Sequence, residues 1–289
     1  MSETSDLQTG LGELLPVPER PTRIWALGLS YEDHIRETGS GRGAPPIVFS
    51  KDVGSWLPHG DTVRIPSSAD LAQRLRTLEP DIAARVGEEL GPLLPMMDYE
   101  GEIAIVVLER ITSREFGHGK LPRVGFAVAN DLTARSIQVL GEGAVDPLAF
   151  WRGAKSFPGF LPVSPRMWVP HGTPAVMPDF PLVTYVNGRS RQTGRSRDLV
   201  YSLPTMLEVC AERSGELDAG DVILTGTPAG VAFQVTAWKR RLANLFLNRI
   251  GRLGAAYRAY VGSSDFLQPG DVVEVEAGPL GSRRVTLTV

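Results

Sequence analysis

Cysteine is nearly absent from this chain, since Cys210 is the only one in 289 residues. A single cysteine excludes an internal disulfide and any zinc or iron–sulfur site built from several cysteines. Long hydrophobic runs are missing too, because no uninterrupted apolar stretch approaches the roughly 20 residues that span a bilayer. The first residues have neither the basic start nor the apolar core of a secretion signal. We therefore expect a cytoplasmic protein with no integral membrane segment and with a loose or docked arm over residues 1–20.

An excess of positive charge is also lacking. The formal net charge is -3, so the chain as a whole has no attraction to a phosphate backbone or an acidic membrane. Hydrophobic residues make up 42% of the sequence, enough to build a substantial core without a disulfide or a structural metal. These properties exclude nucleic acid as the default partner and favour a small molecule.

What the chain does have is a series of short apolar runs bounded by glycine, proline and aspartate. Runs of this kind are typical of strands, and 31 glycines and 23 prolines indicate many tight turns between them. The clearest runs are residues 102–108, 182–186, 221–225 and 272–276. Many strands at irregular spacing predict an α+β, mainly β fold and not a doubly wound parallel sheet.

Helical periodicity is limited to three regions. Residues 69–90 have leucines and other apolar residues at steps of three and four, but Pro80 must interrupt them, which predicts two short helices. Residues 202–213 form a second candidate with Pro204 in the first turn. The third, residues 238–260, combines an apolar face with six positive charges and no acid. We expect a helix docked beside the active-site mouth or at a subunit interface, and an anionic surface is the alternative.

Two glutamates stand directly before an apolar strand. On an extended chain, residues two apart point to the same side, so Glu100 and Glu102 can present both carboxylates to one point. Like charges held together need an ion or a shared proton, and oxygen ligands select magnesium, calcium or manganese. The plain alternative is an exposed strand face with two solvated acids.

Three further signals have a functional and a structural interpretation. Asp131 follows a strand-like run, and it is either a third metal ligand or a helix N-cap. Lys155 lies among small and aromatic residues, and it is either a buried ammonium with an anionic partner or a surface lysine. His34 and Glu37 lie side by side on one helical turn, and they are either a base with its orienting carboxylate or an exposed pair.

Taken in order, these signals resemble the fumarylacetoacetate hydrolase family. The match covers nearly everything from about residue 21 to residue 289, and its seven motifs are collinear with those of the family. They are residues 28–37, 98–102, 129–138, 153–157, 186–188, 220–231 and 267–276.

The resemblance implies a mixed β-roll fold with a small N-terminal subdomain and inserted helices. It divides the chain into an arm over residues 1–20, a small segment over residues 21–66 and a catalytic domain over residues 67–289. Two stretches, near residues 69–95 and 234–265, are insertions relative to the family pattern, and Ser30 and Ala232 replace the Asn and Gly that are frequent there. These departures leave the metal site intact but affect the expected substrate.

The site residues follow by position within the motifs. The resemblance implies that Glu100, Glu102 and Asp131 bind one Mg²⁺ or Mn²⁺ ion per active site. His34 would be the water-activating base, Glu37 its orienter and Lys155 the lysine at the metal. The residues that would contact substrate are Arg135, Gln138 and Thr227. Proteins of this family are commonly homodimers, so we expect a homodimer.

The expected activity is hydrolysis of a carbon–carbon bond in an acylpyruvate or 1,3-diketo acid, through a metal-stabilised enolate and a water activated by His34. The alternative is an isomerase, tautomerase or decarboxylase of a 2-oxo acid at the same site. A third class, a non-catalytic binding protein that keeps the fold, is disfavoured because every expected catalytic position is retained.

Overall fold

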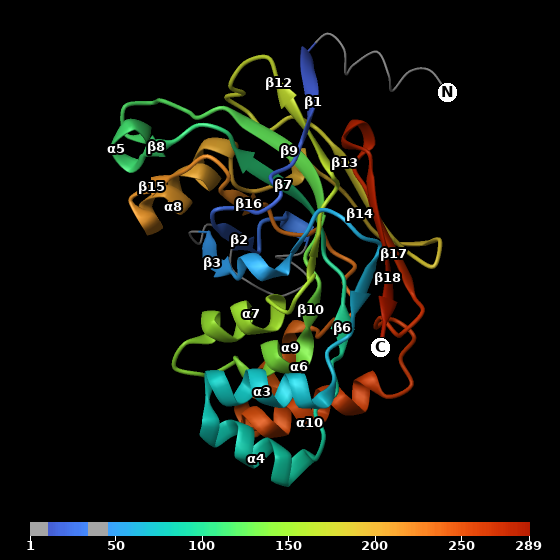
Figure 1. The fold of residues 1–289 in the computed structure, drawn as a ribbon. Coiled ribbons are helices and arrows are strands. Elements are labelled where there is room, and N and C mark those ends of the chain that lie inside the picture. Colours follow the sequence, from blue (N-terminus) through green and yellow to red (C-terminus); the bar gives the residue numbers. More distant parts are fainter. Residues whose placement is uncertain (1–10, 34–45) are drawn as a thin grey trace.

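Two β-sheets and a layer of helices make up the computed structural model, which describes residues 11–33 and 46–289 (Figure 1). The larger sheet has seven strands in the order β1 (Gly12–Pro16), β12 (Arg166–Pro170), β9 (Val124–Asn130), β7 (Gly101–Val107), β16 (Val222–Leu224), β2 (Ile24–Gly28) and β3 (Ile47–Lys51). The smaller has five, in the order β14 (Arg189–Arg195), β13 (Pro181–Val186), β17 (Val272–Glu276), β18 (Ser282–Thr288) and β5 (Thr62–Arg64). The mixed sheets confirm the α+β, mainly β prediction, and the four expected strands are β7, β13, β16 and β17.

Three two-stranded ribbons and eight helices complete the described part. The ribbons are β6 (Met97–Asp98) with β10 (Thr133–Ala134), β4 (Trp56–Leu57) with β11 (Leu161–Pro162), and β8 (Ile111–Thr112) with β15 (Glu216–Leu217). The helices are α3 (Ser68–Leu78), α4 (Pro80–Leu90), α5 (Ser113–Phe116), α6 (Arg135–Leu140), α7 (Pro147–Lys155), α8 (Leu203–Ser214), α9 (Ala237–Phe246) and α10 (Arg249–Tyr260). Three short 3-10 turns cover Val53–Ser55, Ser196–Asp198 and Gly278–Leu280. None of the described helices is long and apolar enough to cross a membrane.

The antiparallel pair β7 and β9 forms the centre of the larger sheet, and every residue of both strands is buried. Strands buried on both faces need apolar residues at every position, which explains their nearly continuous Val, Ile and Ala sequence. Their register pairs Gly101 with Asn130. The start of β7 therefore lies beside the end of β9, where the Asp131 N–H donates to the Glu100 carbonyl at 2.8 Å.

Helices α3, α4, α6, α7 and α10 gather at one end of the molecule, below the sheets in Figure 1. Pro80 lies in the first turn of α4, so the prediction of two short helices in this region is confirmed. Helix α3 begins with a capping box in which Ser67 and Asp70 satisfy each other's backbone N–H groups. The two insertions lie in contact here, because Arg249 of α10 forms an ion pair with Glu79 at 2.8 Å.

The prediction of one helix over residues 238–260 is wrong, since the chain forms α9 and α10 with a break between them. Leu247 is extended, and the Asn248 side chain accepts a hydrogen bond from the Gly251 N–H at 2.7 Å, which caps a new helix. Helix α10 buries Ile250 and Leu253 in the core of the helical layer. Helix α9 instead leaves large apolar side chains exposed, at Trp238, Leu242, Leu245 and Phe246.

Candidate metal centre and active site

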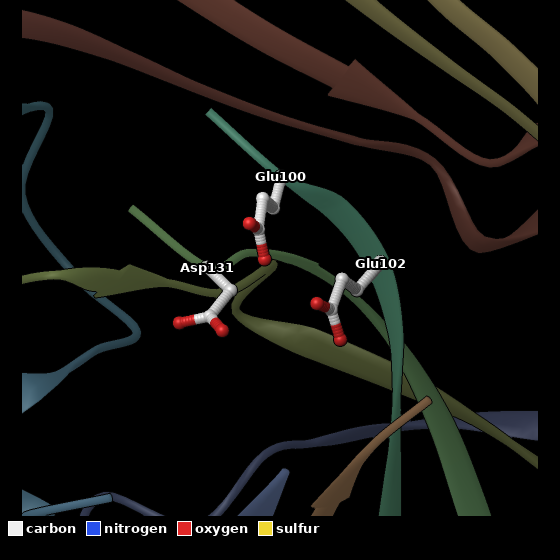
Figure 2. Close-up of side chains that lie close together, drawn as sticks. All are labelled: Glu100, Glu102 and Asp131. Atoms are coloured by element: carbon white, nitrogen blue, oxygen red, sulfur yellow. The ribbon is translucent and has the colours of Figure 1, made fainter. Parts of the chain in front are cut away.

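Three carboxylates converge at the junction of β7 and β9. Glu100 precedes β7, Glu102 is its second residue, and Asp131 directly follows β9. All three residues are at least 93% buried, and each offers an oxygen within 4.8 Å of the others. Figure 2 shows the three carboxyl groups close together, with Glu100 and Glu102 projecting from the same strand end. The same-side geometry expected for the two glutamates is therefore present, and the solvated alternative is wrong.

Lys155, the last residue of α7, is buried beside these acids. Its Nζ donates to Glu100 Oε2 at 2.5 Å, to Asp131 Oδ2 at 2.7 Å and to Thr133 Oγ1 at 2.8 Å. The surface-lysine alternative is therefore wrong, as is the helix-cap alternative for Asp131. Helix α6 begins only at Arg135, and Asp131 uses its carboxylate to bind lysine.

Lys51 is a site residue that sequence reasoning missed. It ends β3, is 3% exposed, and its Nζ forms an ion pair with Asp131 Oδ1. The available signal was a lysine that closes the apolar run of residues 47–49, since a charge at the end of a buried strand needs a partner. That partner is 80 positions away, so spacing along the chain could not identify it.

Arg135 connects the acids to a neighbouring loop. Its Nε donates to Asp98 at 2.7 Å, its Nη2 to Glu100 at 2.7 Å and its Nη1 to Gln138 at 2.5 Å. The Asp98 carboxylate also accepts from the backbone N–H groups of Ala232 and Phe233, at 2.8 and 3.0 Å. Asp98 thus fixes the start of the second insertion against the site.

Thr227 lines the same cavity as Lys155 and lies on the loop after β16. Its hydroxyl donates to the Gly101 carbonyl at 3.0 Å and accepts from Gln192 Nε2 at 2.7 Å. On the same loop, the Gly226 N–H donates to Glu102 at 2.8 Å. Gly226 has φ 86°, a conformation that favours glycine. The loop is therefore shaped to place one backbone donor on a carboxylate and one hydroxyl in the site.

The electrostatics of the cluster follow from burial and crowding. Burial raises the pKa of Glu102 well above its ordinary value, and the nearby charges of Asp131 and Glu100 raise it further. Burial lowers the pKa of Lys51. For Lys155 burial acts in the same direction, but the attraction of Asp131 and Glu100 outweighs it and the pKa is raised. Glu102 is thus the carboxylate whose charge the protein compensates least, and no described lysine or arginine forms an ion pair with it.

A cavity of about 160 Å³, here called the acid pocket, opens onto this cluster. Its walls include the three acids, Lys155 and the substrate-contact candidates of the sequence: Glu100, Glu102, Asp131, Lys155, Arg135, Gln138 and Thr227. Residues 27–29 line it as well, so the chain that leads to His34 starts at its wall. His34 and Glu37 themselves lie outside the described residues, and their roles stay predictions, as does the homodimer.

Comparison with known proteins identifies the family. The family model for the fumarylacetoacetate (FAA) hydrolase C-terminal domain matches residues 23–288. Oxaloacetate tautomerase fahd-1 of Caenorhabditis elegans, a mitochondrial protein, is 31% identical over 217 residues, which are 73% of this chain and 84% of that protein. Oxaloacetate tautomerase YisK of Bacillus subtilis is 28% identical over 272 residues, or 92% of this chain and 70% of the relative.

Solved structures share the fold. A 5-carboxymethyl-2-hydroxymuconate delta-isomerase from Mycobacterium smegmatis aligns with a TM-score of 0.59 at 23% identity, covering 95% of this chain and 81% of its own. A 2-hydroxyhepta-2,4-diene-1,7-dioate isomerase from Mycobacterium marinum aligns with a TM-score of 0.56 at 21% identity, covering 96% of this chain and 77% of its own. With the sheets, the acid cluster and a family model that spans almost the whole sequence in agreement, the chain belongs to the fumarylacetoacetate hydrolase family of enzymes.

Proposed function

We propose that this protein is a divalent-cation-dependent tautomerase that enolises a small 2-oxo acid in the acid pocket. The observation that carries the proposal is the convergence of Glu100, Glu102 and Asp131 on one buried point, with Lys155 bonded to two of them. The relatives named oxaloacetate tautomerase support this reaction over hydrolysis. Hydrolysis, which the sequence alone favoured, becomes the second candidate.

The donor set fits a hard cation such as Mg²⁺ or Mn²⁺, because all three candidate ligands are carboxylates. With Asp98, the cluster contains four acids. Only three described cationic residues form ion pairs with these acids: Lys51, Lys155 and Arg135. Among the described residues, Glu102 is therefore the carboxylate without an ion-pair partner. A bound divalent cation would supply that charge and would polarise the carbonyl oxygens of an oxo acid, which stabilises enolate character.

The chain's own residues supply orientation and proton transfer. Lys155 and Lys51 hold the Asp131 carboxylate from two sides, which fixes it for ligation. Arg135, Gln138 and Thr227 line the pocket and offer polar groups to the substrate's carboxylate. His34 would move the proton at the carbon next to the carbonyl, and Glu37 would orient its ring.

Acylpyruvate hydrolysis is retained because one observation favours it. A second cavity of about 630 Å³ adjoins the acid pocket, which is more room than a four-carbon acid needs. In that reaction His34 would take its proton from water, and the attack would fall on the distal carbonyl.

The test compares the two reactions in one preparation. Purified protein with Mg²⁺ or Mn²⁺ is assayed for oxaloacetate tautomerisation by the loss of enol absorbance and for acylpyruvate cleavage by the release of pyruvate. We expect tautomerisation to be the faster reaction and His34→Ala to lower it by roughly 10²-fold, the scale for losing a general base. His118→Ala is the control, because His118 is exposed and binds only its own helix turn. Cleavage without tautomerisation would identify the protein as a hydrolase. The absence of both activities would refute the proposal.

A further inference from the structure

The second cavity adjoins the acid pocket. Its volume is about 630 Å³, and four residues line both spaces: Val139, Glu142, Val231 and Phe233. We call it the insert cavity because much of its wall comes from the insertion over residues 234–265. The two spaces therefore meet at these four residues, and a molecule bound at the three acids lies beside the larger space.

The floor of the insert cavity is one face of α10. Three alanines line it: Ala255, Ala256 and Ala259. Because their side chains are small, they leave space that a larger side chain would fill. This face is fixed in position, because the Tyr257 hydroxyl accepts a hydrogen bond from the Leu94 N–H at 2.9 Å. Gly254 packs against Leu90, which lets α10 approach α4 closely. The two insertions thus hold one another and form a preformed wall.

Another part of the lining is the segment after the loop that contains Thr227. Val231, Ala232 and Phe233 line the cavity there, and Asp98 holds this segment by two backbone hydrogen bonds. Phe266 closes the end of the cavity with an apolar surface. Most of the lining is therefore small or apolar.

The charged groups of the lining balance one another. Arg191 donates to Asp265 Oδ1 at 2.8 Å, and Arg252 donates to the Leu247 carbonyl at 3.0 Å and to the Glu142 carbonyl. One of these contacts, Arg191 with Asp265, is an ion pair, and the lining as a whole has two arginines and two acids, Glu142 and Asp265. An anionic ligand group would gain no net attraction here and would have to compete with existing partners.

We propose that the insert cavity binds an uncharged, mainly apolar acyl or aryl substituent of the substrate, whose oxo acid group occupies the acid pocket. This inference rests on the proposed function. It means that the natural substrate is larger than a four-carbon oxo acid, and that Ala255 and Ala259 determine specificity by leaving room for the substituent.

The test uses oxamate and N-phenyloxamate, which share a chelating head and differ by one phenyl group. Both are titrated by calorimetry into the full-length protein with saturating Mn²⁺. We expect N-phenyloxamate to bind at least about tenfold more tightly, which is a modest return for burying an aromatic ring. N-(4-carboxyphenyl)oxamate, with a charged end, should lose most of that gain.

The variant Ala255→Phe fills the cavity and should abolish the preference for N-phenyloxamate while leaving oxamate binding within about twofold. Ala84→Phe is the matched control, since Ala84 is exposed on α4 and lines neither cavity. Should Ala255→Phe not fold, Ala259→Phe places the same ring at an exposed position of the same wall.

The outcomes separate the two proposals. Oxamate binding with no gain from the phenyl group, or a gain that survives both cavity variants, overturns the insert-cavity proposal and leaves the proposed function standing. If N-(4-carboxyphenyl)oxamate binds more tightly than N-phenyloxamate, the proposal that the substituent is uncharged is wrong. Failure of either ligand to bind in the presence of Mn²⁺, together with no turnover of oxo acids, overturns the function and this inference with it.

Discussion

The acid pocket and the insert cavity share a wall but are built from different parts of the chain. The acid pocket lies at the end of the central strand pair and collects its charges from β3, β7, α7 and the residues around β9. The insert cavity is lined by α10 and the segment after Gly230, with several alanines and one ion pair, Arg191 with Asp265. The acid pocket is small and contains several buried acids and their cationic partners, whereas the insert cavity is large and its described lining has no net formal charge.

This difference separates the chemistry from the selectivity. Strands buried on both faces hold the acids rigidly, which suits a site whose geometry decides the reaction. The insertions can change the size of the neighbouring space without moving any of those strands. We therefore expect substitutions in the acid pocket to alter cation binding and turnover, and substitutions in the insertions to alter stability or ligand preference alone.

The largest effect should come from Glu102→Gln. We expect the thermal stabilisation by Mg²⁺ or Mn²⁺ to disappear and turnover to fall by on the order of 10³-fold, the scale of losing a group that stabilises developing charge. Without a cation the variant should melt at or above the parent temperature, since it removes a buried charge that has no ion pair among the described residues.

Thermal-shift titrations of parent and variant measure both effects. Asp265→Asn, in the wall of the insert cavity, is the control and should keep the full cation response. Parental cation affinity in Glu102→Gln would contradict the ligand role of this residue.

Lys155→Met should have the next largest effect. Removing the buried ammonium leaves Glu100 and Asp131 without their shared partner, and breaking such a pair costs about 3–5 kcal/mol. Saturating Mg²⁺ should reduce this loss in the free energy of unfolding, because the cation then compensates the same carboxylates. Urea unfolding with chelator and with Mg²⁺ measures the two values. An equal loss under both conditions would mean that the cation binds elsewhere.

Arg85→Gln provides the matched comparison for this variant. The Arg85–Glu89 ion pair at 2.8 Å is exposed on α4, so solvent screens it and its removal should cost less than about 1 kcal/mol.

The smallest effect should come from Asn248→Ala, at the break between α9 and α10. Loss of the cap leaves the Gly251 N–H without its side-chain acceptor and should lower the free energy of unfolding by about 1 kcal/mol. Cation binding should be unchanged, since the residue lines neither cavity. A changed cation affinity in this variant would show that the insertions also affect the metal site, so that the two regions would not act independently.

The candidate site illustrates what could be predicted from the sequence and where prediction ended. The two-residue period of a strand was enough to place Glu100 and Glu102 on one side. Asp131 was identified, but its two roles stayed open, because a strand end is equally suited to a cap or a ligand. The start of α6 at Arg135 excluded the cap, and the ligand role stays a prediction. Lys51 was missed because its partner comes from a distant strand pair.

The helices show the same division. Pro80 alone split residues 69–90 into two helices, because proline cannot continue a helix interior. Between α9 and α10 no proline marks the break, and the helical spacing of apolar residues continues through it. The signal of a new helix is Asn248, whose side chain caps α10.

The sequence by itself determined four of the strands, the same-side arrangement of Glu100 and Glu102, and the family, because each depends on local periodicity or on a contiguous motif. The tertiary structure alone decided that Lys51 and Lys155 grip one aspartate from two sides. It also decided that the two predicted insertions pack together beside a cavity that adjoins the acid pocket. These features join segments 24 to 170 positions apart, and such pairings follow from the packing of the whole chain and not from the preferences of any one segment.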